Sequence, residues 1–230
     1  MSRTTPVRSI AAPALSMLLL ALSMLSLPAC SIVPKKEPLS LYAPQAQVQP
    51  DPSWPTVQWQ LQLPRPHASE LLDSPRIVVR PSEGELQVYH GAVWAEPAPD
   101  LVQDAVLAAF EDSGRIGGVG RRGTGIAGDY ELLLDIRRFE SDYAGGATPQ
   151  ADVEIVAKLV ANRTNVVVAT RTLRQRVPAS GTAVGEVTRA FGTAMTNIVQ
   201  ELVGWTLVEG ERYEKANPPP VPARANATKR

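Results

Sequence analysis

The sequence predicts an α+β protein with a single folded domain, in which a mostly antiparallel sheet of about six strands is covered on one face by two helices. Three observations predict this class. Several stretches alternate apolar and polar residues with the period of two that half-buried strands show. Two longer stretches repeat apolar residues at steps of three and four, as helices do. Turn-forming residues separate successive strands. The predicted domain covers residues 56–209, a length that suits one hydrophobic core.

The domain begins with strands. Four apolar residues alternate with three glutamines from Val57 to Leu63, so we expect one buried and one wet face there. A short apolar run bounded by prolines, residues 76–80, predicts a buried strand. Residues 85–89 alternate again, and the turn sequence Ser-Glu-Gly separates the two runs. These two runs are therefore predicted to form a hairpin.

The first helix is predicted to begin at Asp100, an N-cap residue that follows a proline, and to stop at Gly114. Apolar residues recur at helical spacing between them. The glycine-rich residues 117–128 lack the Gly-Lys-Ser/Thr of a phosphate-binding loop and the spacing of a dinucleotide fingerprint. We expect a flexible loop there, with Arg121 and Arg122 as candidates for contact with an anionic partner or a lipid headgroup.

Three long strands are predicted to follow as an antiparallel meander, over residues 129–139, 151–161 and 165–177. Asn-Arg-Thr-Asn at residues 162–165 supplies polar residues that tolerate the left-handed conformation of a tight turn. Asp152 and Glu154 alternate with apolar residues along the second strand. The pattern predicts that these two acids point outward as a solubilising face.

A second helix is predicted over residues 182–203, where apolar residues step by threes and fours along one side. The other side is polar, so packing against the sheet explains the apolar stripe without a partner helix. After Glu209 the chain becomes rich in proline and lacks apolar mass. Residues 210–230 are therefore predicted to form a disordered, slightly basic tail.

The beginning of the chain predicts an export signal. Arg3 and Arg8 give a positive start, an uncharged apolar run follows, and the small residue Ala29 precedes Cys30. A transmembrane helix is the competing interpretation and needs about 20 apolar residues. The run here is shorter and is broken by prolines. We therefore predict a signal peptide over residues 1–29.

Cys30 is the predicted lipidation site. It is the only cysteine, so it has no disulfide partner within the chain and is free, intermolecular or modified. Leu27 and Ala29 before it resemble the lipobox of bacterial lipoproteins, whose cysteine is acylated. Ser31 rather than Asp at the next position implies, by that resemblance, the outer membrane. Residues 30–55 carry frequent prolines and predict a semi-rigid tether that holds the domain some distance off the membrane.

Composition argues against several functions. Loss of residues 1–29 removes two arginines and no acid, so the remaining chain stays close to neutral and offers no basic surface for nucleic acid. No cluster of His and Cys has the spacing of metal ligands, so no metal or cofactor is expected. His67 and His90 are the only imidazoles, and no residue is arranged with either as a nucleophilic group. We predict a protein that is not an enzyme.

The order of short motifs along the chain resembles a known family. Ile-x-Val, a turn and Leu-x-x-Tyr precede Val-Trp-Ala-Glu-Pro and an amphipathic helix, and Phe-Glu ends the first long strand. This order resembles the ABC-type transport auxiliary lipoproteins, the PqiC-like outer-membrane lipoproteins encoded with MCE-type lipid carriers. The matching residues are Ile77, Val79, Leu86, Tyr89, Trp94, Ala95, Glu96, Pro97, Leu107, Phe139 and Glu140.

The resemblance implies a non-catalytic lipoprotein at the outer membrane that faces the periplasm. It would serve an ABC-linked MCE system that moves phospholipid or another apolar substrate between membranes. The implied partners are an MCE-domain protein with its ABC permease and ATPase, and the membrane through the N-terminal lipid; a homo-oligomer stays open. Tyr89, Trp94 and Pro97 are candidate contact residues, with core packing or a turn as the competing interpretation.

Two functions of other classes also stay open. A lipoprotein that plugs or assembles an outer-membrane barrel would share the anchor and the fold, and it would copurify with a barrel. An envelope hydrolase would need a pocket with a nucleophile. The transported substrate is not indicated by the sequence.

Overall fold

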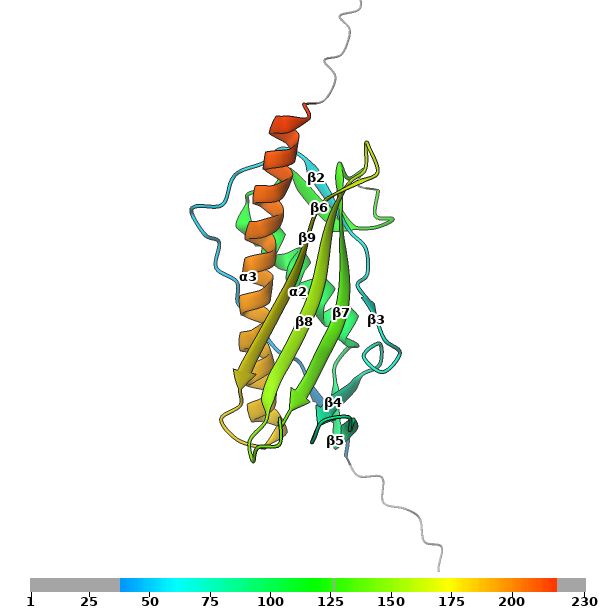
Figure 1. Ribbon diagram of the computed structural model, residues 1–230, viewed down its shortest axis with the longest axis vertical. Coiled ribbons are helices and arrows are strands. Elements are labelled where there is room, and N and C mark those ends of the chain that lie inside the picture. The colour runs from blue at the N-terminus through cyan, green and yellow to red at the C-terminus, as the bar shows by residue number, and fades with distance from the viewer. Residues whose placement is uncertain (1–37, 126, 219–230) are drawn as a thin grey trace, which may run out of the picture. The chain divides into compact units, whose positions relative to one another are not determined.

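The computed structural model describes residues 38–218 with the exception of residue 126 (Figure 1). The predicted signal peptide, Cys30 and the last part of the predicted tail lie outside these residues. The described elements are β1 (Ser40–Tyr42), β2 (Gln60–Leu63), β3 (His67–Ala68), β4 (Arg76–Arg80), β5 (Gln87–Trp94), α2 (Ala98–Ser113), β6 (Gly118–Arg121), β7 (Tyr130–Asp142), β8 (Gln150–Ala161), β9 (Val166–Pro178) and α3 (Val184–Ala216).

The strands form one sheet of nine, organised around the long strand β7. On one edge β7 pairs antiparallel with β8, and β8 pairs antiparallel with β9, which confirms the predicted meander. β4 and β5 form the predicted antiparallel hairpin. Asn165 has a φ of 54°, as the polar turn before β9 requires. The α+β class is therefore confirmed.

The sheet is larger and more mixed than the sequence predicts. Three short strands follow one another along the second edge of β7, and all are parallel to it: β2 at Tyr130, β3 at Asp135 and β4 at Glu140. β1 and β6 add parallel pairs with β5 and β2. A period of two reports which side chains are buried but not which way a neighbouring strand runs. The prediction of a mostly antiparallel sheet of about six strands is therefore wrong in both respects.

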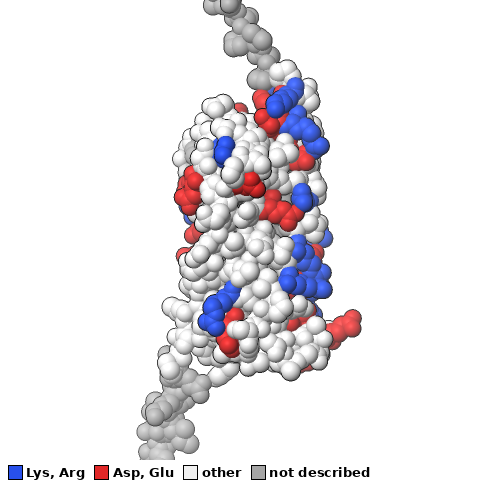
Figure 2. All heavy atoms as spheres, turned by 90° about the vertical axis from the view of Figure 1, so that its left-hand side faces the viewer, with Lys and Arg blue, Asp and Glu red and all other residues white. Residues whose placement is uncertain are grey.

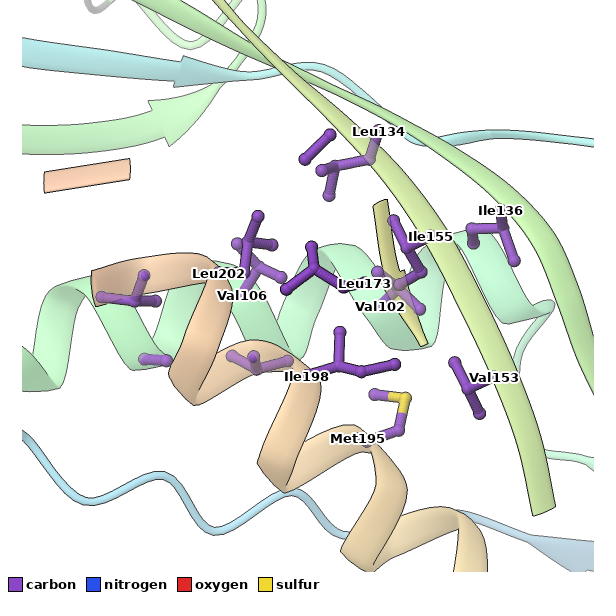
Figure 3. Close-up of a cluster of buried hydrophobic side chains, with 14 of the residues drawn as sticks. Val102, Val106, Leu134, Ile136, Val153, Ile155, Leu173, Met195, Ile198 and Leu202 are labelled. Carbon is purple, nitrogen blue, oxygen red and sulfur yellow. The ribbon is translucent and has the colours of Figure 1, made fainter. Parts of the chain in front are cut away.

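The hydrophobic core lies between the two helices and the inner face of the sheet (Figure 3). Its side chains come from α2 (Val102, Val106), α3 (Met195, Ile198, Leu202) and β7 to β9 (Leu134, Ile136, Val153, Ile155, Leu173). Trp94 packs edge-on between two phenylalanines, with ring centroids 5.8 Å from Phe139 and 5.0 Å from Phe191. Both predicted helices therefore exist and bury the stripes predicted from their spacing.

The ends of the helices differ from the predictions in detail. The N-cap of α2 is Pro97, whose side chain has no hydrogen-bonding atom, and not Asp100 as predicted. Asp100 lies in the first turn and accepts hydrogen bonds from Arg65. Gly114 adopts the left-handed conformation expected of a helix stop, with φ 59°. α3 continues to Ala216, beyond residue 209, where the tail was predicted to begin.

The glycine-rich stretch predicted to be a flexible loop contains a strand, β6, which pairs with β2. The backbone comes unusually close there. A Cβ atom placed on Gly117 would lie 2.3 Å from the carbonyl oxygen of Gln58. Glycine directly before β6 therefore permits a close approach of two backbone segments.

Part of the predicted tether is packed on the domain. Residues 43–59, here called the strap, run beside α3 in the direction of that helix (Figure 1). The backbone N–H of Gln47 donates to Oγ1 of Thr196 at 2.9 Å, and the indole of Trp54 lies against Gly204. Trp54 is buried. The strap ends at Trp59, which lies against Gly210. The tether interpretation is therefore wrong for residues 43–55 of the strap, whereas residues 56–59 were predicted to belong to the domain.

Candidate functional site

The three candidate contact residues lie in different environments. Trp94 is 1% exposed in the aromatic centre of the core and offers no surface to a partner. Tyr89 is half-buried, and its hydroxyl lies 3.0 Å from Oγ of Ser141. Burial raises the pKa of Tyr89. Pro97 is the N-cap of α2. The structure does not bring the three together as one surface.

Two rows of charged residues cross the outer face of the sheet, away from the helices. The register of β7, β8 and β9 places Glu140 beside Asp152, and Asp152 beside Arg176. In the next row, Arg138, Glu154 and Arg174 are neighbours in the same way. Arg80 joins from β4. We call these seven residues, Arg80, Arg138, Glu140, Asp152, Glu154, Arg174 and Arg176, the charge cluster.

Asp152 is at the centre of the charge cluster and is 0% exposed. Arg174 donates to its carboxylate from Nε at 2.9 Å and from a terminal nitrogen at 2.5 Å. Arg176 adds a third contact from Nε at 3.3 Å. The hydrogen bond to Asp152 raises the pKa of the Arg174 guanidinium.

Glu140 is the second buried acid of the charge cluster, at 4% exposed. Arg80 donates to it from Nε at 2.9 Å and from a terminal nitrogen at 3.0 Å, in the two-pronged geometry typical of arginine and carboxylate. Arg138 donates to the same side chain at 2.7 Å. The hydrogen bond from Arg80 to Glu140 raises the pKa of that guanidinium.

Arginine side chains, and not a helix, exclude water from these acids. The arginine side chains that cover the acids keep part of their own surface exposed, from 22% for Arg80 to 51% for Arg176. The prediction that Asp152 and Glu154 form a solubilising face is therefore wrong. The sequence did contain a signal: two acids and two arginines repeat at a spacing of two on consecutive strands, which places opposite charges side by side.

A polar hollow of about 450 Å³ adjoins the charge cluster. Arg80, Arg138 and Arg176 line it together with Ser82 and Asp142. Each of these arginines already binds a carboxylate, so the hollow is close to neutral and its donors are held in fixed directions. Chemically, the arrangement can hydrogen-bond to a polar or zwitterionic surface.

The other predicted polar residues pair locally. His67 is an exposed imidazole whose Nδ1 lies 3.3 Å from a carboxylate oxygen of Asp135. Arg121 pairs with Asp104 at 2.6 Å, and Arg122 lies 3.5 Å from Glu131. Within residues 38–218, leaving aside 126, no group of three or more His, Cys, Asp or Glu side chains could hold a metal ion. In the same residues, no helix has the length and apolar character needed to cross a membrane.

Comparison with known proteins identifies the family. Residues 39–203 match the family described as the ABC-type transport auxiliary lipoprotein component. An uncharacterised protein of Bradyrhizobium diazoefficiens is 28% identical over 157 residues, which are 68% of this chain and 42% of that protein. The chain thus spans less than half the length of this curated relative.

Solved structures show the same fold. A crystal structure of a Xanthomonas campestris protein is 50% identical, covers 76% of this chain and 99% of its own, and has a TM-score of 0.74. An uncharacterised protein that is 12% identical covers 73% of this chain and 97% of its own with a TM-score of 0.57, and so shares the fold alone. The family match spans the sheet, α2 and most of α3. The chain belongs to the ABC-type transport auxiliary lipoprotein family.

Proposed function

We propose that the protein is a non-catalytic component of an ABC-linked MCE system that moves phospholipid between the two membranes of the cell envelope. In this proposal residues 1–29 are a cleaved signal peptide, and acylated Cys30 anchors the domain at the outer membrane, facing the periplasm. The observation that carries the proposal is the family match over residues 39–203, which takes in almost the whole described domain and not one motif.

The proposed role is to dock an MCE-domain protein and its permease at the membrane. An elongated, rigid domain supports such a role. α3 has 33 residues, which at about 1.5 Å per residue correspond to roughly 50 Å of helix, and the sheet and the strap brace it on two sides. Because its donors and acceptors are fixed by ion pairs, the charge cluster is our candidate docking surface. Contact through Tyr89 or Pro97 remains a second prediction.

A crosslinked pull-down from native envelopes, with the lipidated protein as bait, tests the proposal. We expect recovery of an MCE-domain protein together with its permease. The Cys30→Ser variant, which lacks the acylated side chain, is expected to recover far less. Recovery of a barrel protein without an MCE protein would contradict the proposal in favour of a barrel-assembly role.

The docking surface is tested with two arginine variants in the same pull-down. Arg176→Gln removes a half-exposed charge from the charge cluster, whereas Arg137→Gln removes a similarly exposed charge from the same sheet outside the cluster. We expect at least a threefold loss of MCE recovery for the first and no loss for the second. Equal recovery from both variants, with both proteins folded, would exclude the charge cluster as the docking surface.

A further inference from the structure

Exposed apolar side chains lie in or directly before β1 and β5, two strands that pair with each other at one end of the sheet order. Leu39 and Leu41 are 60% and 68% exposed, and Leu86 and Val88 are 46% and 42% exposed. We call these four residues the apolar corner. They are half of the large apolar side chains that are exposed in the described chain. Isolated exposed leucines are ordinary, whereas four exposed apolar side chains on two paired strands are a candidate surface for contact with something apolar.

The fold itself does not need the two leucines of β1. Tyr42 pairs in register with Trp94 and packs on the core, whereas Leu41, one residue earlier, points to the other side of the strand. β1 is the end strand of the sheet order, so its outer edge has no neighbouring strand in the described chain. Packing therefore explains Tyr42 and leaves Leu39 and Leu41 unexplained.

The position of Cys30 in the sequence indicates what covers the apolar corner. Nine residue steps separate Cys30 from Leu39, and at about 3.3–3.6 Å per residue they span at most roughly 30 Å. A longer reach is not available, because the following residues pair with β5 and then form the strap. The described chain starts at the end of the domain where β4 and β5 lie, opposite the end of α3 (Figure 1).

We propose that the apolar corner inserts into the lipid bilayer in which Cys30 is anchored, at the boundary between headgroups and acyl chains. The inference rests on the proposed acylation of Cys30 but not on the proposed partner. A short anchor keeps the apolar corner at high effective concentration beside the bilayer, so a few leucines suffice for insertion.

Apolar contact, and not charge, is expected to drive this insertion. Arg76 is exposed and pairs in register with Val93 beside the corner, but Glu83 and Glu85 are exposed in the adjoining turn. Figure 2, which shows another side of the domain, likewise has charges of both signs separated by broad uncharged surface. We therefore expect insertion to change less than twofold when anionic lipid is omitted.

The experiment uses single cysteines, because an acylated Cys30 leaves no other thiol in the chain. Leu41→Cys, in the full lipidated protein, is labelled with the environment-sensitive dye NBD and reconstituted into vesicles of phosphatidylethanolamine and phosphatidylglycerol. Val167→Cys is the matched control, since Val167 is 52% exposed but lies at the opposite end of the domain, by the turn between β8 and β9. We expect at least a twofold rise in NBD emission and quenching by nitroxide lipids at position 41 only.

A second variant separates insertion from anchoring. With the dye at Leu86→Cys, the double change Leu39→Ser and Leu41→Ser should reduce quenching by nitroxide lipids at least threefold while the protein still floats with the vesicles. Both leucines are exposed, so the midpoint of unfolding should not change.

Several results would overturn the inference. Solvent-like emission at position 41 in a protein that floats would exclude insertion and leave the anchor intact. If the dye at position 41 is shielded from water in the soluble Cys30→Ser protein, and more so at higher protein concentration, a second copy of the chain covers the apolar corner instead. If the dye is shielded from water only after MCE protein is added, a protein partner covers the apolar corner. A protein whose Cys30 carries no acyl mass and does not float would overturn the proposed anchoring and this inference together.

Discussion

The inner face of the sheet is covered by α2 and α3, whereas the outer face at the ends of β7, β8 and β9 carries the charge cluster. Both faces withdraw side chains from water. On the inner face apolar side chains do so by packing against helices. On the outer face guanidinium groups cover two carboxylates, so Asp152 is as deeply buried as the core residue Leu173. Burial on this sheet therefore does not follow from apolar character alone.

The inner face should give the largest loss of stability when it is truncated. Phe191→Ala removes a ring that contacts Trp94 and Phe139, and we expect a loss of about 3–5 kcal/mol in the free energy of unfolding, measured with urea. Val208→Ala, on the exposed side of the same helix, is the control and should cost less than about 1 kcal/mol. Similar losses for the two variants would mean that the helices do not form the core described here.

On the outer face, the loss in the free energy of unfolding should depend on whether one charge of the Asp152–Arg174 pair is removed or both. Arg174→Met leaves Asp152 buried with Arg176 as its remaining partner, and we expect a loss of about 2–3 kcal/mol. Replacing both residues, Asp152→Leu with Arg174→Met, removes the stranded charge and should recover at least half of that loss. Additive losses in this double-mutant cycle would show that the two side chains do not depend on each other.

The strap extends the comparison to the side of α3 that faces away from the sheet. A Cβ atom on Gly204 would lie 2.5 Å from Nε1 of Trp54, so Gly204→Ala should displace the indole and cost about 1–3 kcal/mol. Gly185→Ala, in the same helix with no atom within 4 Å of its Cβ position, should be neutral or stabilising by up to about 1 kcal/mol. Thermal unfolding of both variants would measure the difference; equal effects would mean that the strap is not held at Gly204.

The smallest effect concerns a polar contact at the edge of the core. The Tyr130 hydroxyl donates to Glu214 at 2.7 Å, and burial together with that bond raises the pKa of Tyr130. Tyr130→Phe should cost about 1.5 kcal/mol at neutral pH. An unfolded tyrosine ionises near pH 10, so the contribution of Tyr130 is complete below that pH and is lost as pH rises above it. The stability gap between the two proteins should therefore narrow above pH 10; a constant gap from pH 8 to 11 would contradict this.

Local sequence patterns identified the long strands and the helices, but they did not predict which short strands pair with β7 or in which direction. Alternation identified β7, β8 and β9, and the polar turn before Asn165 fixed how β8 and β9 pair. The same alternation gave no direction for β2, β3 and β4, because a parallel and an antiparallel neighbour bury the same side chains.

The candidate site was missed for a related reason. The alternation of residues at Asp152 and Glu154 is typical of a solvent-exposed strand face. These two acids would be exposed if the neighbouring residues on β9 were small. Arg174 and Arg176 stand there instead, and their long side chains cover the acids. Trp94 shows the opposite case, since a motif residue that suggested a contact surface lies at the centre of the core.

The sequence by itself determined the two helices, the three long strands, the hairpin of β4 and β5, and the family to which the chain is similar, because periodicity and motif order are local properties. Only the tertiary structure decided that three short strands share one edge of β7, that four arginines cover buried acids, and that the strap lies along α3. These features depend on side chains far apart in the chain, whose mutual distances are set by the packing of the whole domain. The pairing of β1 with β5 leaves nine residue steps between Cys30 and Leu39, and the proposed insertion of the apolar corner depends on that short length.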